Sequence, residues 1–191
     1  MSWLRRHWNP SPAALKLTRV KALVAAILVL MAAVSMISPV FLSTRNFLNI
    51  LEQLSINAIM AAGMTFVIIA AGIDLSVGSI LALGSMGTAS LLASGIPAPA
   101  AILGGLLVGT GAGAINGVAV AYGRIPAFIM TLGMLNVARG TVLFLTRGNS
   151  IVGFPEGFLF LGRGRIGPVP VLVLITGSVY LICHLALVKT R

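Results

Sequence analysis

The sequence predicts an all-α protein, a polytopic transmembrane bundle of about six helices with its N-terminus in the cytoplasm. Two observations predict this class. Of the 191 residues, 58% are hydrophobic and only 8% are charged, whereas soluble domains carry about 25% charged residues. The charges are also separated by long uncharged runs, and a helix needs about 20 apolar residues to cross the hydrocarbon core of a bilayer. These features exclude an ordinary water-soluble enzyme.

Six apolar stretches are the predicted spans. They cover residues 22–42, 54–71, 75–94, 100–122, 126–145 and 168–187. Pro97 and Pro99 divide the uncharged run 75–123 into two helices, because the residue before a proline is disfavoured in a helix. The fifth stretch is the weakest, since it contains Arg139. All six are apolar on every face, which is atypical of the alternating strands of a transmembrane barrel.

Residues 1–21 are predicted to form a basic cytoplasmic segment ahead of a transmembrane domain that covers residues 22–191. The basic residues of this segment are Arg5, Arg6, Lys16, Arg19 and Lys21. Cytoplasmic loops of membrane proteins carry an excess of Lys and Arg, and Trp favours the headgroup level, where Trp3 and Trp8 would lie. The formal charge of +10 therefore indicates the cytoplasmic side of the membrane rather than a nucleic-acid partner.

The stretch 100–122 contains a row of glycines spaced four residues apart. The row consists of Gly105, Gly109, Gly113 and Gly117. On a membrane helix, small residues at this spacing form a smooth stripe that lets a second backbone come close. We therefore expect these four residues to pack against a neighbouring helix. The alternative interpretation is a helix that slides or hinges during transport.

Asp74 is the only acidic residue inside the long apolar part of the chain. A carboxylate at membrane depth is costly and is by default a functional candidate. Asp is also a preferred helix N-cap, because its side chain accepts hydrogen bonds from free backbone N–H groups. The sequence leaves both roles open, capping of the next helix and direct action in transport. It also leaves open whether residues 72–74 form a surface loop or an interruption inside the membrane.

Neutral polar residues inside the spans resemble the lining of a pathway for a neutral, hydroxylated solute. The candidate pathway residues are Asn57, Thr65, Asp74, Ser76, Asn116 and Asn136. A pathway for charged solutes more often shows internal charges. For any one of these residues, a hydrogen bond to a neighbouring helix is the other interpretation.

Residues 146–167 form the longest polar connection, which is predicted to face the outside. Phe154, Phe158 and Phe160 favour a short interfacial helix within it. The sequence contains no GxxxxGK[ST] phosphate loop, no catalytic arrangement and no cluster with metal-ligand spacing, and its single Cys183 excludes an internal disulfide. We therefore expect no enzymatic activity, no metal and no cofactor bound by this chain.

The most specific motif is the run Gly-Ile-Asp-Leu-Ser-Val-Gly-Ser at residues 72–79. Shorter matching runs lie at residues 46–51, 57–65, 113–117, 126–134 and 139–140. Together these runs resemble the permease subunits of bacterial ABC importers for ribose, xylose, galactoside and related sugars. The resemblance covers about residues 20–191, which is nearly the whole chain.

The resemblance implies a multi-pass permease of the bacterial inner (plasma) membrane that moves a neutral monosaccharide, a ribose-like pentose or a related sugar. It also implies four partners, namely membrane lipid, a cytoplasmic ABC ATPase subunit, a periplasmic sugar-binding protein and a second permease copy. ATP would be used by the ATPase subunit and not by this chain. No nucleic acid is implied.

The resemblance also carries an expectation about length. Permeases of this family continue past the position of Lys189 into a segment that docks on the ATPase, and further helices follow. We therefore expect the sequence to be the N-terminal part of such a permease, truncated before the coupling segment. Two alternatives to an active permease stay open: a secondary transporter or channel, and an inactive truncated remnant.

Overall fold

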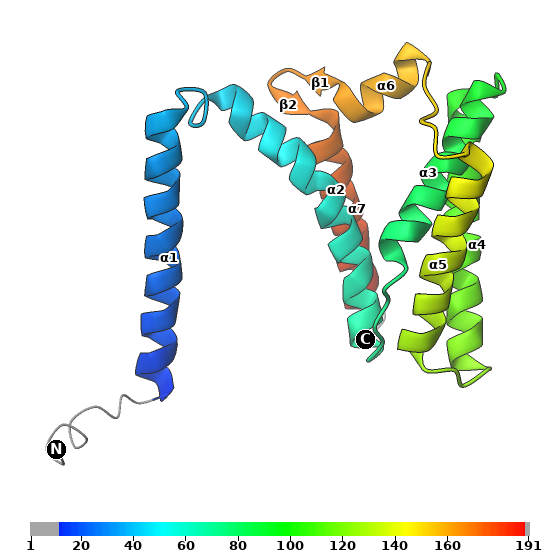
Figure 1. The fold of residues 1–191 in the computed structure, drawn as a ribbon, viewed down its shortest axis with the longest axis horizontal. Helices are drawn as coiled ribbons and strands as arrows, with labels where there is room; N and C mark the ends of the chain where they lie inside the picture. The colour runs from blue at the N-terminus through cyan, green and yellow to red at the C-terminus, as the bar shows by residue number, and fades with distance from the viewer. Residues whose placement is uncertain (1–11, 190–191) are drawn as a thin grey trace, which may run out of the picture. The chain divides into compact units, whose positions relative to one another are not determined.

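The structure is a computed structural model that describes residues 12–189, with side chains described from Val20 onward. These residues form seven α-helices and one two-stranded hairpin (Figure 1). The chain divides into two units within its second helix, between Ile50 and Leu51. The predictions for Arg5, Arg6, Trp3 and Trp8 lie outside the described residues.

The first unit contains helix α1 (Pro12–Ile37) and the beginning of helix α2 (Thr44–Ile69). Helix α1 runs without a break across residue 21, where the sequence predicts the end of a separate segment. Ser43 begins α2 as its N-cap, because its Oγ accepts a hydrogen bond of 3.2 Å from the N–H of Asn46.

The second unit contains the rest of α2, a packed group of three helices, and a helix with a hairpin at one end. The three helices are α3 (Val77–Ala93), α4 (Ala98–Ala121) and α5 (Ala127–Thr146), which lie side by side (Figure 1). Next come α6 (Glu156–Arg163), β1 (Arg165–Ile166), β2 (Val169–Pro170) and α7 (Val171–Lys189). Helices α4, α5 and α6 each begin directly after a proline, which suits a position whose N–H has no helical partner.

The prediction of a polytopic helical bundle is confirmed. Helices α1, α2, α4, α5 and α7 are long and apolar enough to cross a membrane. The third predicted span differs, because α3 has 17 residues and is therefore about 25 Å long, against a hydrocarbon core of about 30 Å. The cytoplasmic position of the N-terminus stays a prediction.

Two features of the segment between α5 and α7 bear on the prediction for this region. Helix α6 is the short helix that the phenylalanines favour. The antiparallel pair β1 and β2, with Arg165 opposite Pro170, adds a short hairpin of two-residue strands to the otherwise helical fold of the described residues. Its turn contains Gly167 at φ +60°, a conformation that glycine adopts without steric cost.

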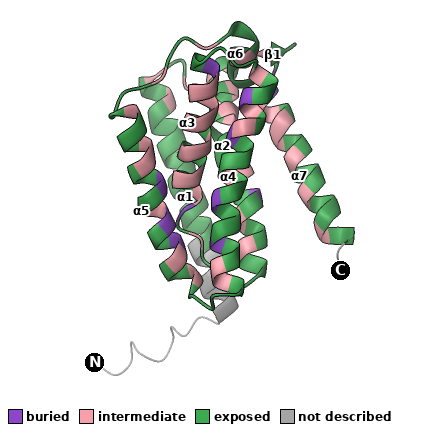
Figure 2. Ribbon diagram, turned by 90° about the vertical axis from the view of Figure 1, so that its right-hand side faces the viewer, coloured by how far each residue is buried: buried purple, intermediate pink, exposed green. Residues whose placement is uncertain are grey.

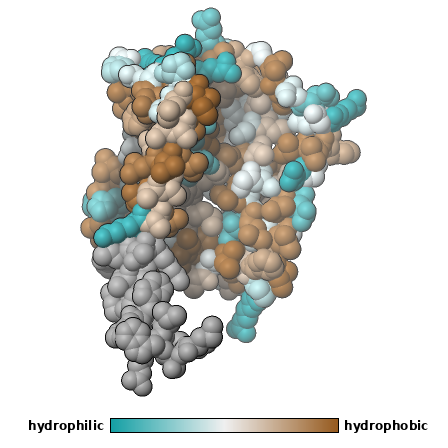
Figure 3. Space-filling view, turned by 60° about the vertical axis from the view of Figure 1, so that its left-hand side comes forward, coloured by the Kyte–Doolittle hydropathy of each residue, from teal (hydrophilic) through white to brown (hydrophobic). Residues whose placement is uncertain are grey.

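Small residues dominate the buried positions of the described bundle. Ala62, Ala101, Ala112 and Ala138 are buried, whereas Leu107 and Phe144 are 72% and 80% exposed. Figure 2 shows the same division on α4 and α5, where a few buried positions lie among many exposed ones. Apolar side chains cover most of the face seen in Figure 3. Such a surface suits lipid or further helices.

Helices α3 and α4 come very close together at Gly84 and Gly105. A Cβ on Gly105 would lie 2.5 Å from the Gly84 carbonyl oxygen, and a Cβ on Gly84 would lie 2.9 Å from the Gly105 carbonyl oxygen. Real Cβ atoms do not approach an oxygen this closely. The two helices therefore require glycine at both positions.

The glycine row of α4 faces α3 at one end only. A Cβ on Gly109 would contact Ile80 of α3, but Gly113 and Gly117 are exposed and have nothing within 4 Å of such a Cβ among the described residues. A step of four residues overshoots a helical turn by about 40°, so three steps rotate the row by about 120°. The buried face of α4 instead continues through Ala112 and Asn116. Packing by Gly113 and Gly117 stays a prediction.

We expect Gly105→Ala to lower the stability of the bundle by about 1–3 kcal/mol, because overpacking forces helices apart. Gly113→Ala is the matched control, since its added methyl group meets nothing within 4 Å. Thermal unfolding of both variants in detergent tests this. A Gly105→Ala variant as stable as the Gly113→Ala variant would show that α3 and α4 are not in close contact.

Candidate functional site

The chain is not helical at residues 70–76, between α2 and α3. At the end of α2, the N–H of Ala71 donates to the carbonyl of Ile68 and the N–H of Gly72 to that of Val67, both at 2.9 Å. This pattern is a Schellman motif, which satisfies carbonyls that the helix leaves without partners. Ala71 has φ +55° at the position where glycine is usual, and a non-glycine residue in this conformation costs roughly 1–2 kcal/mol.

Asp74 binds the N-cap residue of α3 rather than capping the helix itself. Both the N–H and the hydroxyl of Ser76 donate to Oδ1 of Asp74, at 2.7 and 2.6 Å. Ser76 is the N-cap, and its carbonyl accepts from the N–H of Ile80 at 2.8 Å. The capping interpretation is therefore corrected: Asp74 forms an Asx turn two residues before the helix and orients the residue that begins it.

Ser76 in turn contacts α4. Nδ2 of Asn116 donates to Oγ of Ser76 at 2.9 Å. Ser76 is fully buried and Asn116 is 6% exposed. Oδ1 of Asn116 is buried and has no hydrogen-bond partner among the described residues.

A second bond holds the same segment to α5. Thr131 Oγ1 lies 3.2 Å from the carbonyl oxygen of Ile73, and its bond to the carbonyl of Ala127, on its own helix, is 2.8 Å long. Residues 73–76 therefore lie against both α4 and α5. The stretch is an interruption packed against two helices of the bundle, and its position inside the membrane stays a prediction.

The structure brings together three of the six predicted pathway residues, namely Asp74, Ser76 and Asn116. The other three, Asn57, Thr65 and Asn136, are exposed. Thr65 and Asn136 donate to carbonyls of their own helices, at 2.9 Å each. A pathway role for all six residues stays a prediction.

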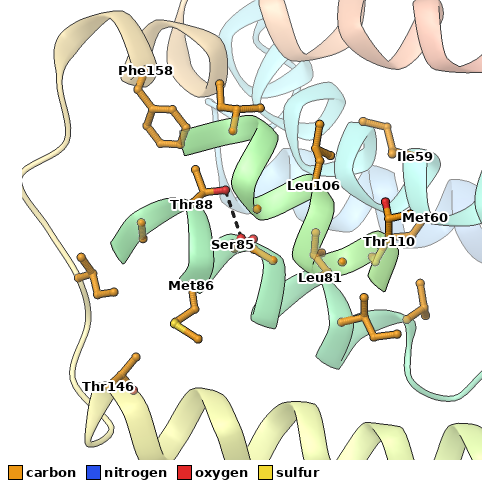
Figure 4. A pocket seen from close by; sticks show the side chains of 18 of the residues that line it. Ile59, Met60, Leu81, Ser85, Met86, Thr88, Leu106, Thr110, Thr146 and Phe158 are labelled. Atoms are coloured by element: carbon orange, nitrogen blue, oxygen red, sulfur yellow. Dashed lines mark hydrogen bonds between the residues drawn. The ribbon is translucent and has the colours of Figure 1, made fainter. Parts of the chain in front are cut away.

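A cavity of about 1040 Å³ lies between α2, α3, α4 and the segment that follows α5 (Figure 4). Its lining is mainly apolar and includes Ile59, Leu81, Leu106 and Phe158. Ser85, Thr88 and Thr110 add hydroxyl groups, and Thr88 donates to the carbonyl of Gly84 at 3.1 Å. None of the six predicted pathway residues lines this cavity.

Sequence reasoning missed the part of the lining that comes from the connection after α5, which includes Asn149, Ser150 and Phe154. The rings of Phe154 and Phe158 meet edge to face, with centroids 5.5 Å apart. These aromatic residues were the available signal, but no periodicity indicates that this connection folds back over α3.

Two further contacts join α2 to the C-terminal part of the chain. Arg165 Nη2 lies 3.2 Å from Glu52 Oε1, and Thr176 Oγ1 of α7 lies 3.4 Å from the carbonyl oxygen of Ser55. The ion pair is partly exposed, so its contribution is about 0–1 kcal/mol. Both contacts lie in the first half of α2, so the hairpin and α7 meet this part of the helix.

The fold defines a multi-pass membrane protein whose bundle is interrupted by a buried polar cluster. Residues 46–189 match the family BPD_transp_2, described as "Branched-chain amino acid transport system / permease component". The chain belongs to this family of permease components. Together with the five apolar helices, this membership places it in the inner membrane.

Individual relatives are import permeases for sugars. The chain is 46% identical over 170 residues to the ribose import permease protein RbsC of Escherichia coli K12, and the match covers 87% of this chain and 53% of that protein. It is 41% identical over 164 residues to RbsC of Bacillus subtilis, covering 85% and 51%. It is 45% identical over 135 residues to the D-allose transport system permease protein AlsC of Escherichia coli K12, covering 69% and 41%.

The chain spans about half the length of the ribose permeases it matches. No solved structure matches it.

We expect Thr131→Val to loosen the interruption, because it removes the hydroxyl next to the Ile73 carbonyl while keeping the side-chain volume. Losing one such bond costs about 0.5–1.5 kcal/mol. Thr141→Val is the matched control, since Thr141 Oγ1 donates only within α5, to the Val137 carbonyl. Hydrogen exchange of residues 72–76 should rise in the first variant alone. An equal rise in both would contradict the contact between Thr131 and Ile73.

Proposed function

We propose that the chain is a permease component of an ABC importer that moves a neutral monosaccharide, ribose or a related sugar, across the inner membrane. The observation that carries this proposal is the 46% identity over 170 residues to a ribose import permease. Relatives named for D-allose and xylose support the same substrate class.

The chemistry of the interruption suits a neutral solute. Ser76 and Asn116 carry hydroxyl and amide groups, and Oδ1 of Asp74 is occupied by two donors from Ser76. A sugar has hydroxyl groups that donate and accept hydrogen bonds and carries no charge that would need a counter-ion. We infer that the candidate pathway passes near this cluster, in which Asp74, Ser76 and Asn116 hold the interruption in place.

We further infer that the chain is not itself an enzyme and binds no cofactor. ATP would be used by a separate ABC ATPase subunit, and an extracytoplasmic sugar-binding protein would deliver the substrate. A second permease copy would complete the membrane part. The family description as a permease component of a transport system supports this division of labour.

The test is uptake of radiolabelled ribose by Escherichia coli cells that lack RbsC but retain the ribose-binding protein and the ATPase. Residues 46–189 replace the matching part of RbsC in a fusion, and the chain is also expressed alone. We expect the fusion to restore uptake, and an ATPase subunit with its phosphate-loop Lys replaced to abolish it.

Two results would contradict the proposal. Uptake that persists with the inactive ATPase and stops when a protonophore collapses the ion gradient would show a secondary transporter. An inserted fusion that takes up none of ribose, allose and xylose would show a protein that does not transport these sugars. RbsC expressed in the same cells is the positive control.

A further inference from the structure

The hydrogen bonds at the interruption run in a single direction. The hydroxyl of Ser76 donates to Oδ1 of Asp74, 2.6 Å away, so its single hydrogen is directed at that oxygen. The oxygen of that hydroxyl is then left to accept from Nδ2 of Asn116 at 2.9 Å. Asp74 therefore determines, through Ser76, which end of the Asn116 amide faces the interruption.

The consequence is an unpaired acceptor at the end of the series. With Nδ2 directed at Ser76, Oδ1 of Asn116 is left buried without a partner among the described residues, on a side chain that is only 6% exposed. A buried polar atom without a partner weakens the arrangement that contains it. The cost of burying the unpaired Oδ1 of Asn116 therefore offsets part of the stabilisation that Nδ2 of the same side chain gains by bonding Ser76.

We propose that Asp74, Ser76 and Asn116 form a directional latch, in which Ser76 and Asn116 are positioning residues that hold the interruption against α4. The unpaired Oδ1 keeps the latch weak enough to open locally, and its opening accompanies transport. Ala71 at φ +55° adds backbone strain five residues before Ser76, in the same non-helical segment. The link to transport rests on the proposed function, whereas the latch itself does not.

The direction of the latch is tested by isosteric exchanges in the full chain in detergent, without sugar. Asp74→Asn keeps an acceptor oxygen for Ser76, so its Tm should stay within about 2 °C of the original protein. Asn116→Asp places a second acceptor against Ser76 and should lower Tm by about 5 °C or more. The double variant Ser76→Ala with Asn116→Asp removes the oxygen that the new carboxylate would face, so Asn116→Asp should lower Tm less in this background than in the original protein.

Hydrogen exchange separates a local latch from general destabilisation. Residues 72–80 should exchange faster than the interior of α4 in the original protein. They should lose protection in Asn116→Asp, while α7 stays unchanged. Three results would each overturn the latch: a tolerated Asn116→Asp with a damaging Asp74→Asn, additive losses in the double variant of Ser76→Ala with Asn116→Asp, or changes spread evenly over all helices.

Transport provides the second readout, in the fusion of the proposed function. Ser76→Ala should lower the maximal rate of ribose uptake by about fivefold and leave KM within about twofold, because a positioning residue does not contact the sugar. A raised KM with an unchanged maximal rate would instead make Ser76 a sugar contact and overturn its positioning role. If the unmutated fusion takes up no sugar, the proposed function fails, while the thermal and exchange series still decides the latch.

Discussion

The structure depends on one constraint, which is that backbone polar groups in apolar surroundings must find partners within the protein. An α-helix meets this requirement by itself, but residues 70–76 do not form one. The Schellman bonds of Ala71 and Gly72, the carboxylate of Asp74 and the hydroxyl of Thr131 supply the missing partners. Because these bonds begin α3 only after Ser76, this helix is shorter than the five candidate spans.

The same apolar surroundings explain why the buried side chains are small. In lipid, a large apolar side chain gains little by moving from the bilayer into a helix interface, so helices associate where their backbones come close and make dispersion contacts. Gly84 and Gly105 provide such a contact, and Ala101 and Ala112 continue it along α4. Large residues such as Leu107 and Phe144 point outward instead. The high glycine and alanine content therefore reflects packing between neighbouring helices.

Much of the fold could be predicted from the sequence, because long gaps between charges and the proline at 97 are local signals. The site could be predicted only in part. Neutral polar residues stood out in the spans, but Asn116 lies 40 positions from Ser76 in the chain. No pattern in a single sequence indicates that these two residues meet and that Asn57 and Asn136 do not join them. The four-residue spacing of the glycines likewise suggested one straight stripe, whereas a helix has 3.6 residues per turn and therefore rotates Gly117 away from α3. No sequence pattern indicated that Glu52 pairs with Arg165, because an isolated charge does not show which distant charge it will meet.

The run at residues 72–79 carries the sequence resemblance and spans the end of the interruption and the start of α3. The structure gives each of its key residues a physical task. A Cβ on Gly72 would come 3.3 Å from the Val67 carbonyl oxygen. Asp74 must accept hydrogen bonds, and Ser76 must both donate and accept them. These tasks are satisfied within the protein, so the motif builds an architecture before it contacts any solute. Under the proposed function, discrimination among sugars would depend on polar groups that do not already use their hydrogen bonds to hold the interruption in place.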